Sequence, residues 1–410
     1  MLSVKNKKFV QGIMVGVAST LVLVTLFLGV NFYRYRNEYK ILLGNTKTSK
    51  AIDKSEEEIF TKIKYLMSMI DQRSIYEPDK QEVVDGIFKG IFSSLGDDYS
   101  CYYTAEEYKK FMEVSEGNYE GIGAYISTNS SGYCYIVSPM KDSPAEESGI
   151  KAGDIIYKVD DKIVTDKTSD EIVAMIKGKE GTKVKITVAR EGEDDYLDLV
   201  VTRKKIESPT VSYEVKKDNI GYIEVTSFDN VTTNQFKEAL IELQKKKVKG
   251  LVIDLRNNPG GNLDVVVDML DMFLSKGQLI VYTEYKKVNR TETYRAQNEA
   301  IVDLPLAVLV NENSASASEI FAGAIKDYKI GKIVGKTTFG KGIVQTVLPL
   351  KDGAAIKFTI AKYITPKGKY IHGKGIKPDV EIEFSKKEYE ENKVDTQLDM
   401  AISQVKKLAK

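Results

Sequence analysis

The stretch LVIDLRNNPGGN at residues 251–262 decides the fold of the C-terminal half of the chain. Its first five residues predict a buried strand, a polar turn with Gly260 and Gly261 follows, and the apolar spacing of residues 262–274 predicts a helix. The stretch LAVLVNENSASASE at residues 306–319 repeats this order of strand, polar turn and helix. Because apolar strands that alternate with helices need cover on both faces of a sheet, we expect an α/β domain here.

The sequence around these two stretches extends the pattern in both directions. Past Ile330 the chain returns to strands, and residues 396–408 predict a closing helix. Further expected elements of the α/β domain are strands at 220–225 and 306–310 and helices at 232–247 and 315–328.

Two regions of different character precede the α/β domain. Residues 52–116 show helical spacing, and Asp79 after Pro78 is placed to cap the second of two helices. Residues 117–206 change to short strands and two helices, which indicates a compact domain of roughly 90 residues. In this domain we expect strands at 133–137 and 184–188 and helices at 143–149 and 168–177.

The N-terminus carries a hydrophobic segment. No charged residue lies between Phe9 and Tyr33, a length that spans the roughly 30 Å hydrocarbon core of a bilayer. A cleaved signal peptide is the alternative, but this run is longer than such a segment and does not end in small residues. We therefore expect a basic segment at 1–11 and an uncleaved single-pass transmembrane anchor at 12–33. Lysine and arginine flank it on both sides, so charge alone does not set its orientation.

Composition limits the chemistry of the chain. The 60 basic and 59 acidic residues give a formal net charge of +1, which argues against nucleic acid as a partner. The chain has a single histidine, His372, so paired-histidine zinc motifs are excluded. Cys101 and Cys134 form no CxxC pair. We expect no metal and no cofactor, with acid–base work falling to Lys, Asp, Glu or Tyr.

The turn at residues 254–262 is the first candidate for chemistry. Gly260 and Gly261 permit left-handed backbone and leave N–H groups directed into a cleft at a helix start, where negative charge is favoured. A plain strand-to-helix turn is the alternative interpretation.

The serine-rich string SASASE at residues 314–319 is the second candidate. A serine in the first turn of a helix can act as a nucleophile, while the following N–H and the helix N-terminus stabilise an oxyanion. A serine-rich helix cap is the alternative. The pattern alone does not choose among Ser314, Ser316 and Ser318.

The string GKTTFGKGIVQ at residues 335–345 is the third candidate. It nearly matches a phosphate-binding P-loop, but Gly342 stands where a Ser or Thr hydroxyl is required, and the residues that follow predict a strand. Lys341, desolvated against Phe339, can instead lose its proton near neutral pH and act as a base. A solvated surface lysine is the alternative.

These three turns, in this order, resemble the C-terminal processing peptidases, also called tail-specific proteases, whose active site is a serine–lysine dyad. The resemblance covers nearly everything after the hydrophobic segment. It rests on LGDDYS at 95–100, GIG at 121–123, SPA at 143–145, GIKAGD at 149–154, DLRNNPGG at 254–261, SASASE at 314–319, TFGKG at 338–342 with Gln345, and Thr365-Pro366 through Pro378-Asp379.

The resemblance assigns roles to individual residues. It implies that Ser316 is the nucleophile, that Lys341 is the base and that Gln345 positions this lysine. It also implies a supporting carboxylate at Asp327. The implied oxyanion donors are the backbone N–H of Ala317 and that of Gly260 or Gly261.

The resemblance also implies how substrates are recognised. A PDZ domain would bind free C-termini of protein substrates and gate the dyad, through the loop residues Gly121, Ile122, Gly123, Ala124, Tyr125 and Ile126. Family members often carry arginine just before the glycine that corresponds to Gly178. This chain has Lys177 there, which cannot make the same bidentate contact.

The expected fold class is therefore α/β and mixed multidomain. It combines the transmembrane helix, a helical arm at 52–116, a PDZ-like domain at 117–206, a crotonase-like α/β serine protease core at 207–385 and a C-terminal helical segment at 386–410. The expected function is a membrane-anchored serine endopeptidase with its catalytic domain outside the cytoplasm, and a homodimer is implied. The alternatives are a catalytically silent PDZ scaffold and a non-protease acyl-transfer or nucleotide enzyme on the same core.

Overall fold

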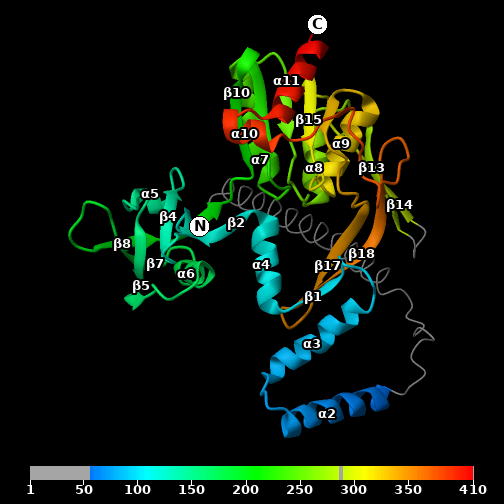
Figure 1. The fold of residues 1–410 in the computed structure, drawn as a ribbon. Coiled ribbons are helices and arrows are strands. Elements are labelled where there is room, and N and C mark those ends of the chain that lie inside the picture. The colour runs from blue at the N-terminus through cyan, green and yellow to red at the C-terminus, as the bar shows by residue number, and fades with distance from the viewer. Residues whose placement is uncertain (1–55, 286–289, 410) are drawn as a thin grey trace, which may run out of the picture. The chain divides into compact units, whose positions relative to one another are not determined.

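The computed structural model describes residues 56–285 and 290–409 (Figure 1). The chain divides into two compact units, residues 1–84 and 85–410. The predicted basic segment at 1–11 and anchor at 12–33 lie outside the described residues. Within the described ranges, no helix is both long and apolar enough to cross a membrane.

The helical arm begins with α2 (Glu56–Arg73) and α3 (Lys80–Ser93). The predicted cap of the second helix is confirmed, because Asp79 Oδ1 accepts the N–H of Gln81 at 2.7 Å. After the 95–100 turn, the arm continues through β1 (Cys101–Tyr103) into α4 (Ala105–Glu116). A reciprocal capping box of Thr104 and Glu107 starts α4, so the sequence itself fixes where this helix begins.

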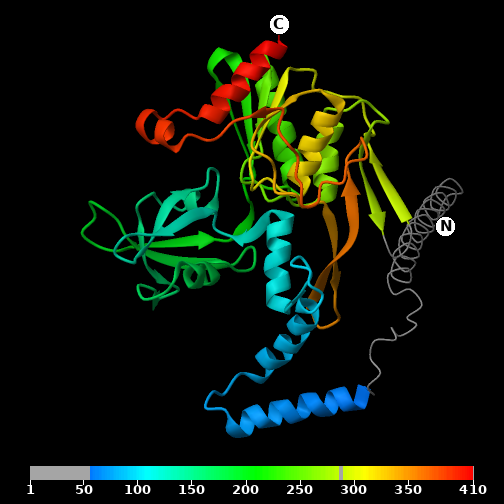
Figure 2. The ribbon, with the colours of Figure 1, turned by 45° about the vertical axis from the view of Figure 1, so that its right-hand side comes forward.

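The region predicted as a PDZ-like domain forms an antiparallel sheet with two short helices (Figure 2). Its core packs Ile136, Ile156 and Ile186, each fully buried. A short pair, β2 (Asn118–Gly121) with β9 (Lys204–Glu207), lies at its chain entry and exit. The elements of the domain are β3 (Ala124–Thr128), β4 (Cys134–Pro139), α5 (Pro144–Glu147), β5 (Ile155–Val159), β6 (Lys162–Ile163), α6 (Ser169–Ile176), β7 (Lys183–Ala189) and β8 (Leu197–Thr202).

The α/β core is built on a six-stranded sheet that is parallel except at β10. Alternate strand residues supply its two faces: Ile253 packs with the cluster of α7, α8 and α9, whereas Val252 packs with α11. In sheet order the strands are β10 (Val211–Lys216), β11 (Ile220–Val225), β12 (Leu251–Asp254), β15 (Leu306–Val310), β16 (Lys332–Gly335) and β19 (Val380–Glu381). The helices are α7 (Thr232–Lys245), α8 (Leu263–Asp271), α9 (Ala317–Tyr328), α10 (Lys386–Asn392) and α11 (Thr396–Leu408).

A second sheet joins the arm to the core. Its central strand β18 (Ala355–Ile364) pairs with β1 of the arm, with β17 (Ile343–Pro349) and with β13 (Leu279–Tyr285), which in turn pairs with β14 (Arg290–Arg295). The strand β17 directly follows the 335–342 turn, as predicted, so the helix that a P-loop requires is absent there.

The topology brings the candidate turns together. Strands β12 and β15 are parallel neighbours, so the turns that leave their carboxyl ends lie at one edge of the sheet. Backbone hydrogen bonds confirm the contact, because the N–H of Ala315 donates to the carbonyl of Asn258 at 3.0 Å and that of Phe339 donates to Ser314 at 3.0 Å. All three predicted turns therefore meet.

Candidate active site

The environment of the three serines separates one of them from the other two. Ser314 Oγ donates to the carbonyl of Leu255 at 2.7 Å, and Ser318 Oγ donates to that of Asn258 at 2.9 Å. Both are fully buried. Ser316 instead lines a cavity of about 390 Å³, and within the described ranges its Oγ donates to no buried carbonyl. The structure therefore leaves Ser316 as the serine whose hydroxyl faces an open space.

The backbone of Ser316 is strained. It has φ 54° and ψ −113°, a conformation that costs a non-glycine residue on the order of 1–3 kcal/mol. Two contacts hold it: its N–H donates to Glu319 Oε2 at 3.0 Å, and the buried Tyr363 hydroxyl donates to its carbonyl at 3.2 Å. The strain explains why α9 begins at Ala317, two residues later than predicted.

Glu319 is the organising residue that the sequence interpretation did not single out. Its carboxylate is fully buried and accepts hydrogen bonds from both sides of the site. Oε1 accepts from Thr338 Oγ1 at 2.6 Å and from the N–H of Gly340 at 2.8 Å. Oε2 accepts from the N–H of Lys341 at 2.8 Å as well as from that of Ser316. The available signal was a glutamate in an otherwise small and apolar first helical turn.

The first glycine turn is held by Asn258. This fully buried side chain donates to the carbonyl of Val225 at 2.8 Å and accepts the N–H of Gly260 at 2.8 Å. A side chain at Gly260 would meet Ser316 Cβ at 2.8 Å, so the glycine allows the two turns to touch. In the described part of the chain, the N–H groups of Gly261 and Ala317 have no hydrogen-bond acceptor, and both residues line the cavity.

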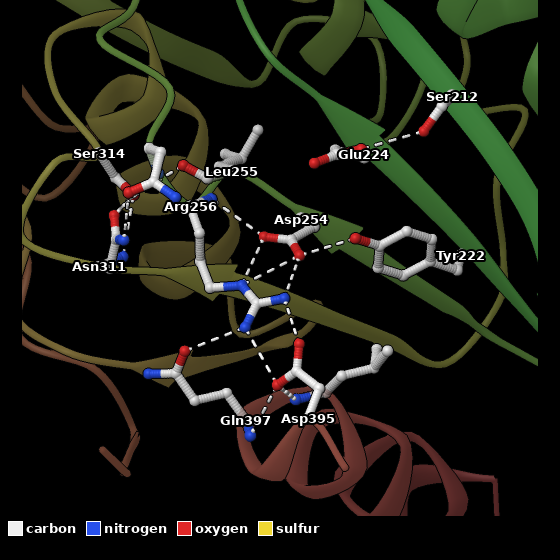
Figure 3. A network of polar contacts seen from close by, with 12 residues as sticks. Ser212, Tyr222, Glu224, Asp254, Leu255, Arg256, Asn311, Ser314, Asp395 and Gln397 are labelled. Carbon is white, nitrogen blue, oxygen red and sulfur yellow. Dashed lines mark hydrogen bonds and ion pairs between the residues drawn. The ribbon is translucent and has the colours of Figure 1, made fainter. Parts of the chain in front are cut away.

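A buried ionic network anchors the start of this turn (Figure 3). The Arg256 guanidinium contacts Asp254 Oδ2 at 2.6 Å and Asp395 Oδ2 at 2.8 Å, and also Gln397 Oε1 at 3.0 Å. The Tyr222 hydroxyl donates to Asp254 Oδ2 at 2.8 Å. Because Asp395 caps α11, the C-terminal helix is tied to the residues that lead into the glycine turn.

Lys341 lines the same cavity as Ser316. Its Nζ lies 4.5 Å from the centre of the Tyr99 ring, which comes from the arm. Burial lowers the pKa of Lys341, the charge of Lys357 lowers it further, and Asp97 and Glu319 oppose the change. The expected cover by Phe339 is wrong, because that side chain is 56% exposed and does not line the cavity. Tyr99 covers the lysine instead.

The remaining predicted residues take different places. Gln345 lines the cavity, and its Nε2 lies 3.5 Å from Thr359 Oγ1. Within residues 56–285 and 290–409, no hydrogen bond joins Lys341 Nζ to Gln345 or to Ser316 Oγ. Asp327 lies on α9 eleven residues after Ser316, where its buried carboxylate accepts from Thr365 Oγ1 at 2.6 Å. It supports the far end of the helix and does not line the cavity.

The predicted peptide-binding loop borders a separate groove in the PDZ-like domain. Tyr125 is the one residue of the predicted set that does not line it. Lys177 borders this groove, and its Nζ contacts Glu113 on α4 at 2.7 Å. The lining residues are Tyr119, Gly121, Ile122, Gly123, Ala124, Ile126, Val173, Ile176 and Lys177.

Helix α4 lies between the groove and the cavity that Ser316 lines. Phe111, Val114 and Ser115 line that cavity, and Glu113 on the same helix holds Lys177. His372 does not line it, and Cys101 and Cys134 are both free. A hydroxyl that faces the cavity, an amine with a lowered pKa and unpaired backbone N–H groups form the set that acyl transfer requires.

Comparisons with known proteins show which proteins this chain is similar to. The family model described as peptidase family S41 matches residues 219–382, and a PDZ domain model matches residues 135–190. A probable CtpA-like serine protease of Staphylococcus aureus strain COL is 41% identical over 345 residues, which cover 83% of this chain and 68% of the relative.

Two further proteins are similar to this chain. A probable CtpA-like serine protease of Staphylococcus haemolyticus strain JCSC1435 is 39% identical over 362 residues, covering 88% of this chain and 72% of the relative. The crystal structure of a putative S41 protease from Bacteroides fragilis NCTC 9343 covers 84% of this chain and 97% of its own, with a TM-score of 0.50 and 17% identity. That likeness shows a shared fold.

Proposed function

Because the chain belongs to peptidase family S41 and is a C-terminal processing serine peptidase, we propose that it cleaves unstructured protein substrates through a dyad of Ser316 and Lys341. The observation that carries this proposal is that the three serine hydroxyls of residues 314–319 have different surroundings. Two hydroxyls are bonded to buried carbonyls, and the third faces the cavity that also contains a lysine of lowered pKa.

The dyad would form an acyl-enzyme in two proton transfers. Neutral Lys341 Nζ takes the Ser316 proton while Oγ bonds to the scissile carbonyl carbon. The resulting ammonium then protonates the leaving amine as the C–N bond breaks. A water molecule, deprotonated by Lys341, releases the new carboxylate and restores the Ser316 hydroxyl.

The oxyanion of each tetrahedral intermediate would be held by the N–H groups of Gly261 and Ala317. Both line the cavity and lack acceptors in the described structure, whereas the N–H of Gly260 is bonded to Asn258. Aligned donors of this kind contribute several kcal/mol to transition-state stabilisation.

The dyad is tested by cleavage of an unstructured protein with a free apolar C-terminus. We expect Ser316→Ala and Lys341→Ala each to lower kcat by at least about a thousandfold, since each removes a group that acts in every turnover. Ser318→Ala is the matched control for folding, because it removes a buried hydroxyl of the same helix. Equal turnover by wild type and Ser316→Ala would reject the dyad.

We further propose that the PDZ groove binds the substrate C-terminus and signals to the dyad through α4. The groove is lined by apolar side chains and meets Lys177, whose ion pair with Glu113 lies on the helix that borders the cavity. A peptide that adds to this groove would act on Lys177 and so on α4.

A charge exchange tests this link. Lys177→Glu places two acidic groups together and should lower cleavage of long substrates about tenfold, while Lys177→Glu with Glu113→Lys should restore most of it. Short peptides that cannot reach both sites supply the reference. If the double variant stays as slow as the single one, the ion pair does not carry the signal.

We also propose that residues 12–33 anchor the protein in the cell membrane with its catalytic domain outside the cytoplasm. Support comes from the uncharged length of this segment. The full chain should sediment with membranes, and a chain starting at residue 52 should not. Protease added to intact spheroplasts should digest the catalytic domain, and full protection would reverse the proposed orientation.

A homodimer through the arm is a last part of the proposal. Phe60, Tyr65, Leu66 and Ile70 of α2 are exposed apolar side chains of the kind that interfaces bury. Light scattering should give twice the chain mass for the wild type and a monomer for Phe60→Glu with Leu66→Glu. A wild-type monomer would exclude this dimer.

A further inference from the structure

A second lysine faces the catalytic cavity. Lys357 on β18 lines it together with Ser316 and Lys341. In the β17–β18 ladder Lys357 pairs with Val347, two residues beyond Gln345. Residues two apart on a strand share a face, and both of these β17 residues also line the cavity. The Lys357 side chain therefore belongs to the catalytic face of the sheet.

Aromatic rings hold Lys357 in place. Its Nζ lies 5.2 Å from the ring centre of Tyr103 and 5.6 Å from that of Phe111, and these two rings stack at 5.3 Å. Over the described ranges, no carboxylate oxygen lies within 4.0 Å of its Nζ. Rings attract an ammonium without neutralising it, so Lys357 brings a positive charge to the cavity. The Asp229 carboxyl also lines this cavity, and burial raises its pKa, which favours its neutral form.

Lys341 is surrounded by groups of both signs. The turn before β1 contributes Asp97 and the Tyr99 ring, α9 contributes Glu319, and β18 contributes Tyr363 and Lys357. His372 lies beside Gly342, and its charge helps to lower the pKa of Asp97.

The charges around Lys341 act in opposite directions. The two carboxylates and the Tyr99 ring favour the ammonium form of Lys341, whereas burial and the charge of Lys357 disfavour it. Of the charged groups named, Lys357 is the cation that lines the same cavity.

We propose that Lys357 is a positioning residue that acts through Lys341, its fixed positive charge keeping Lys341 Nζ unprotonated and ready to accept the Ser316 proton near neutral pH. The inference rests on the proposed dyad. It gives Lys357 an electrostatic role without contact with the reacting bond.

The sign of the effect follows from repulsion. A nearby like charge destabilises the ammonium, so removing it raises the pKa of Lys341. The acidic limb of any reaction that needs neutral Lys341 then moves to higher pH. The plateau at high pH should not change, because Lys341 is neutral there in both proteins.

The test is the rate at which a fluorophosphonate labels Ser316 in the full chain, measured from about pH 5 to pH 10. In this reaction the O–P bond forms, fluoride leaves, and Lys341 receives the serine proton. The variants are Lys357→Met, Lys357→Gln and Lys357→Arg. Lys362→Met is the matched control, because this exposed lysine of the same strand lies over the Tyr370 ring, 4.7 Å from its centre.

Lys357→Met and Lys357→Gln should shift the acidic limb upward by roughly half to one pH unit, which slows labelling about 3- to 10-fold below the limb. Lys357→Arg and Lys362→Met should keep the wild-type limb. Thermal melting identifies any variant that fails to fold. The inference is then judged on the acidic limbs of the variants that do fold. An unshifted limb, or a lower plateau without a shift, overturns the inference. Labelling of Lys341→Ala at the wild-type rate would instead overturn the dyad.

Discussion

The two sides of the catalytic cavity are built differently. On the side of residues 254–261, the polar side chains of Asp254, Arg256 and Asn258 are each bonded at 3.1 Å or less. On the side of residues 338–345, the backbone is equally well held, but Gln345 makes one contact at 3.5 Å. Lys341 Nζ rests on an aromatic ring.

This difference shows which parts of the site are set before substrate binds. The side with the proposed oxyanion donors is a fixed frame, which suits backbone donors that must point at a developing charge. The base side fixes the backbone of Lys341 and leaves its side chain adjustable. Glu319 joins the two sides, since one carboxylate oxygen accepts N–H groups from both Ser316 and Lys341.

The largest effect is expected when that shared carboxylate is changed. Glu319→Gln replaces an acceptor oxygen with a donating amide, so at least one buried N–H of Ser316, Gly340 or Lys341 loses its partner. We expect a loss of roughly 2–4 kcal/mol in the free energy of unfolding, because an unpaired buried donor is costly. Fluorophosphonate labelling should slow at least about a hundredfold, because Ser316 and Lys341 move apart.

Glu312→Gln is the control for this variant. Glu312 lies in the turn before α9 and is exposed, so urea unfolding and labelling should both match the wild type. If Glu319→Gln were to label at the wild-type rate, the two sides would be aligned by other contacts.

The fixed side can be loosened by Arg256→Lys. Lysine keeps the charge but cannot bridge Asp254 and Asp395 with paired hydrogen bonds. We expect roughly 1–3 kcal/mol less stability and about tenfold lower kcat, with KM nearly unchanged, as the glycine turn loses its anchor. Lys217→Met, which removes an exposed partner of Asp399 on α11, should cost less than about 1 kcal/mol. Similar losses of stability in both variants would mean that burial of the network adds nothing to the free energy of unfolding.

The same network predicts a dependence of stability on pH. Burial alone would raise the pKa of Asp395, but hydrogen bonds and charge from Arg256 bring it below the usual range. Because the pKa of Asp395 is lowered in the folded protein, its ionised form adds to the free energy of unfolding above the unfolded pKa of about 3.9. This stabilisation is lost as pH falls through the folded pKa. The stability gap between wild type and Arg256→Lys, measured by urea unfolding, should therefore narrow below about pH 4. A gap that widens in acid would contradict this assignment.

The strands of the α/β core could be predicted from the sequence better than the contacts around Lys341. Strands 220–225 and 306–310 have their predicted bounds, because buried parallel strands read as short apolar runs. The hairpin of β13 and β14 was not predicted, since its second strand, RTETYR, has no apolar run.

The site shows the same division. The meeting of the three turns followed from local patterns and the family resemblance. The cover of Lys341 did not, because Tyr99 lies 242 positions earlier in the chain. Long-range contacts, such as the pairing of β1 with β18, bring the arm to the site. Neighbours in sequence, such as Phe339, were therefore a poor guide to neighbours in space.

The adjustable side is tested by Gln345→Ala. Because this amide makes one weak contact and none with Lys341 in the described structure, we expect little change in unfolding free energy. If it orients Lys341 once substrate is bound, kcat should fall about tenfold with KM unchanged. Thr359→Val removes the weak contact and should leave kcat within about twofold. Loss of stability in Gln345→Ala would show that this side is as fixed as the other.

The smallest effect is expected at the single histidine. His372 lies beside Gly342 but does not line the cavity, and its ring stacks on Tyr370 at 6.0 Å. A dyad that uses Lys341 has no need of imidazole, so His372→Ala should keep kcat within about threefold once folding is confirmed by thermal melting. The pH profile should keep its acidic limb, since the titrating group remains Lys341. If folded His372→Ala were inactive, the base would have to be assigned to His372 instead of Lys341. The comparison between the two sides of the cavity would then lose its basis.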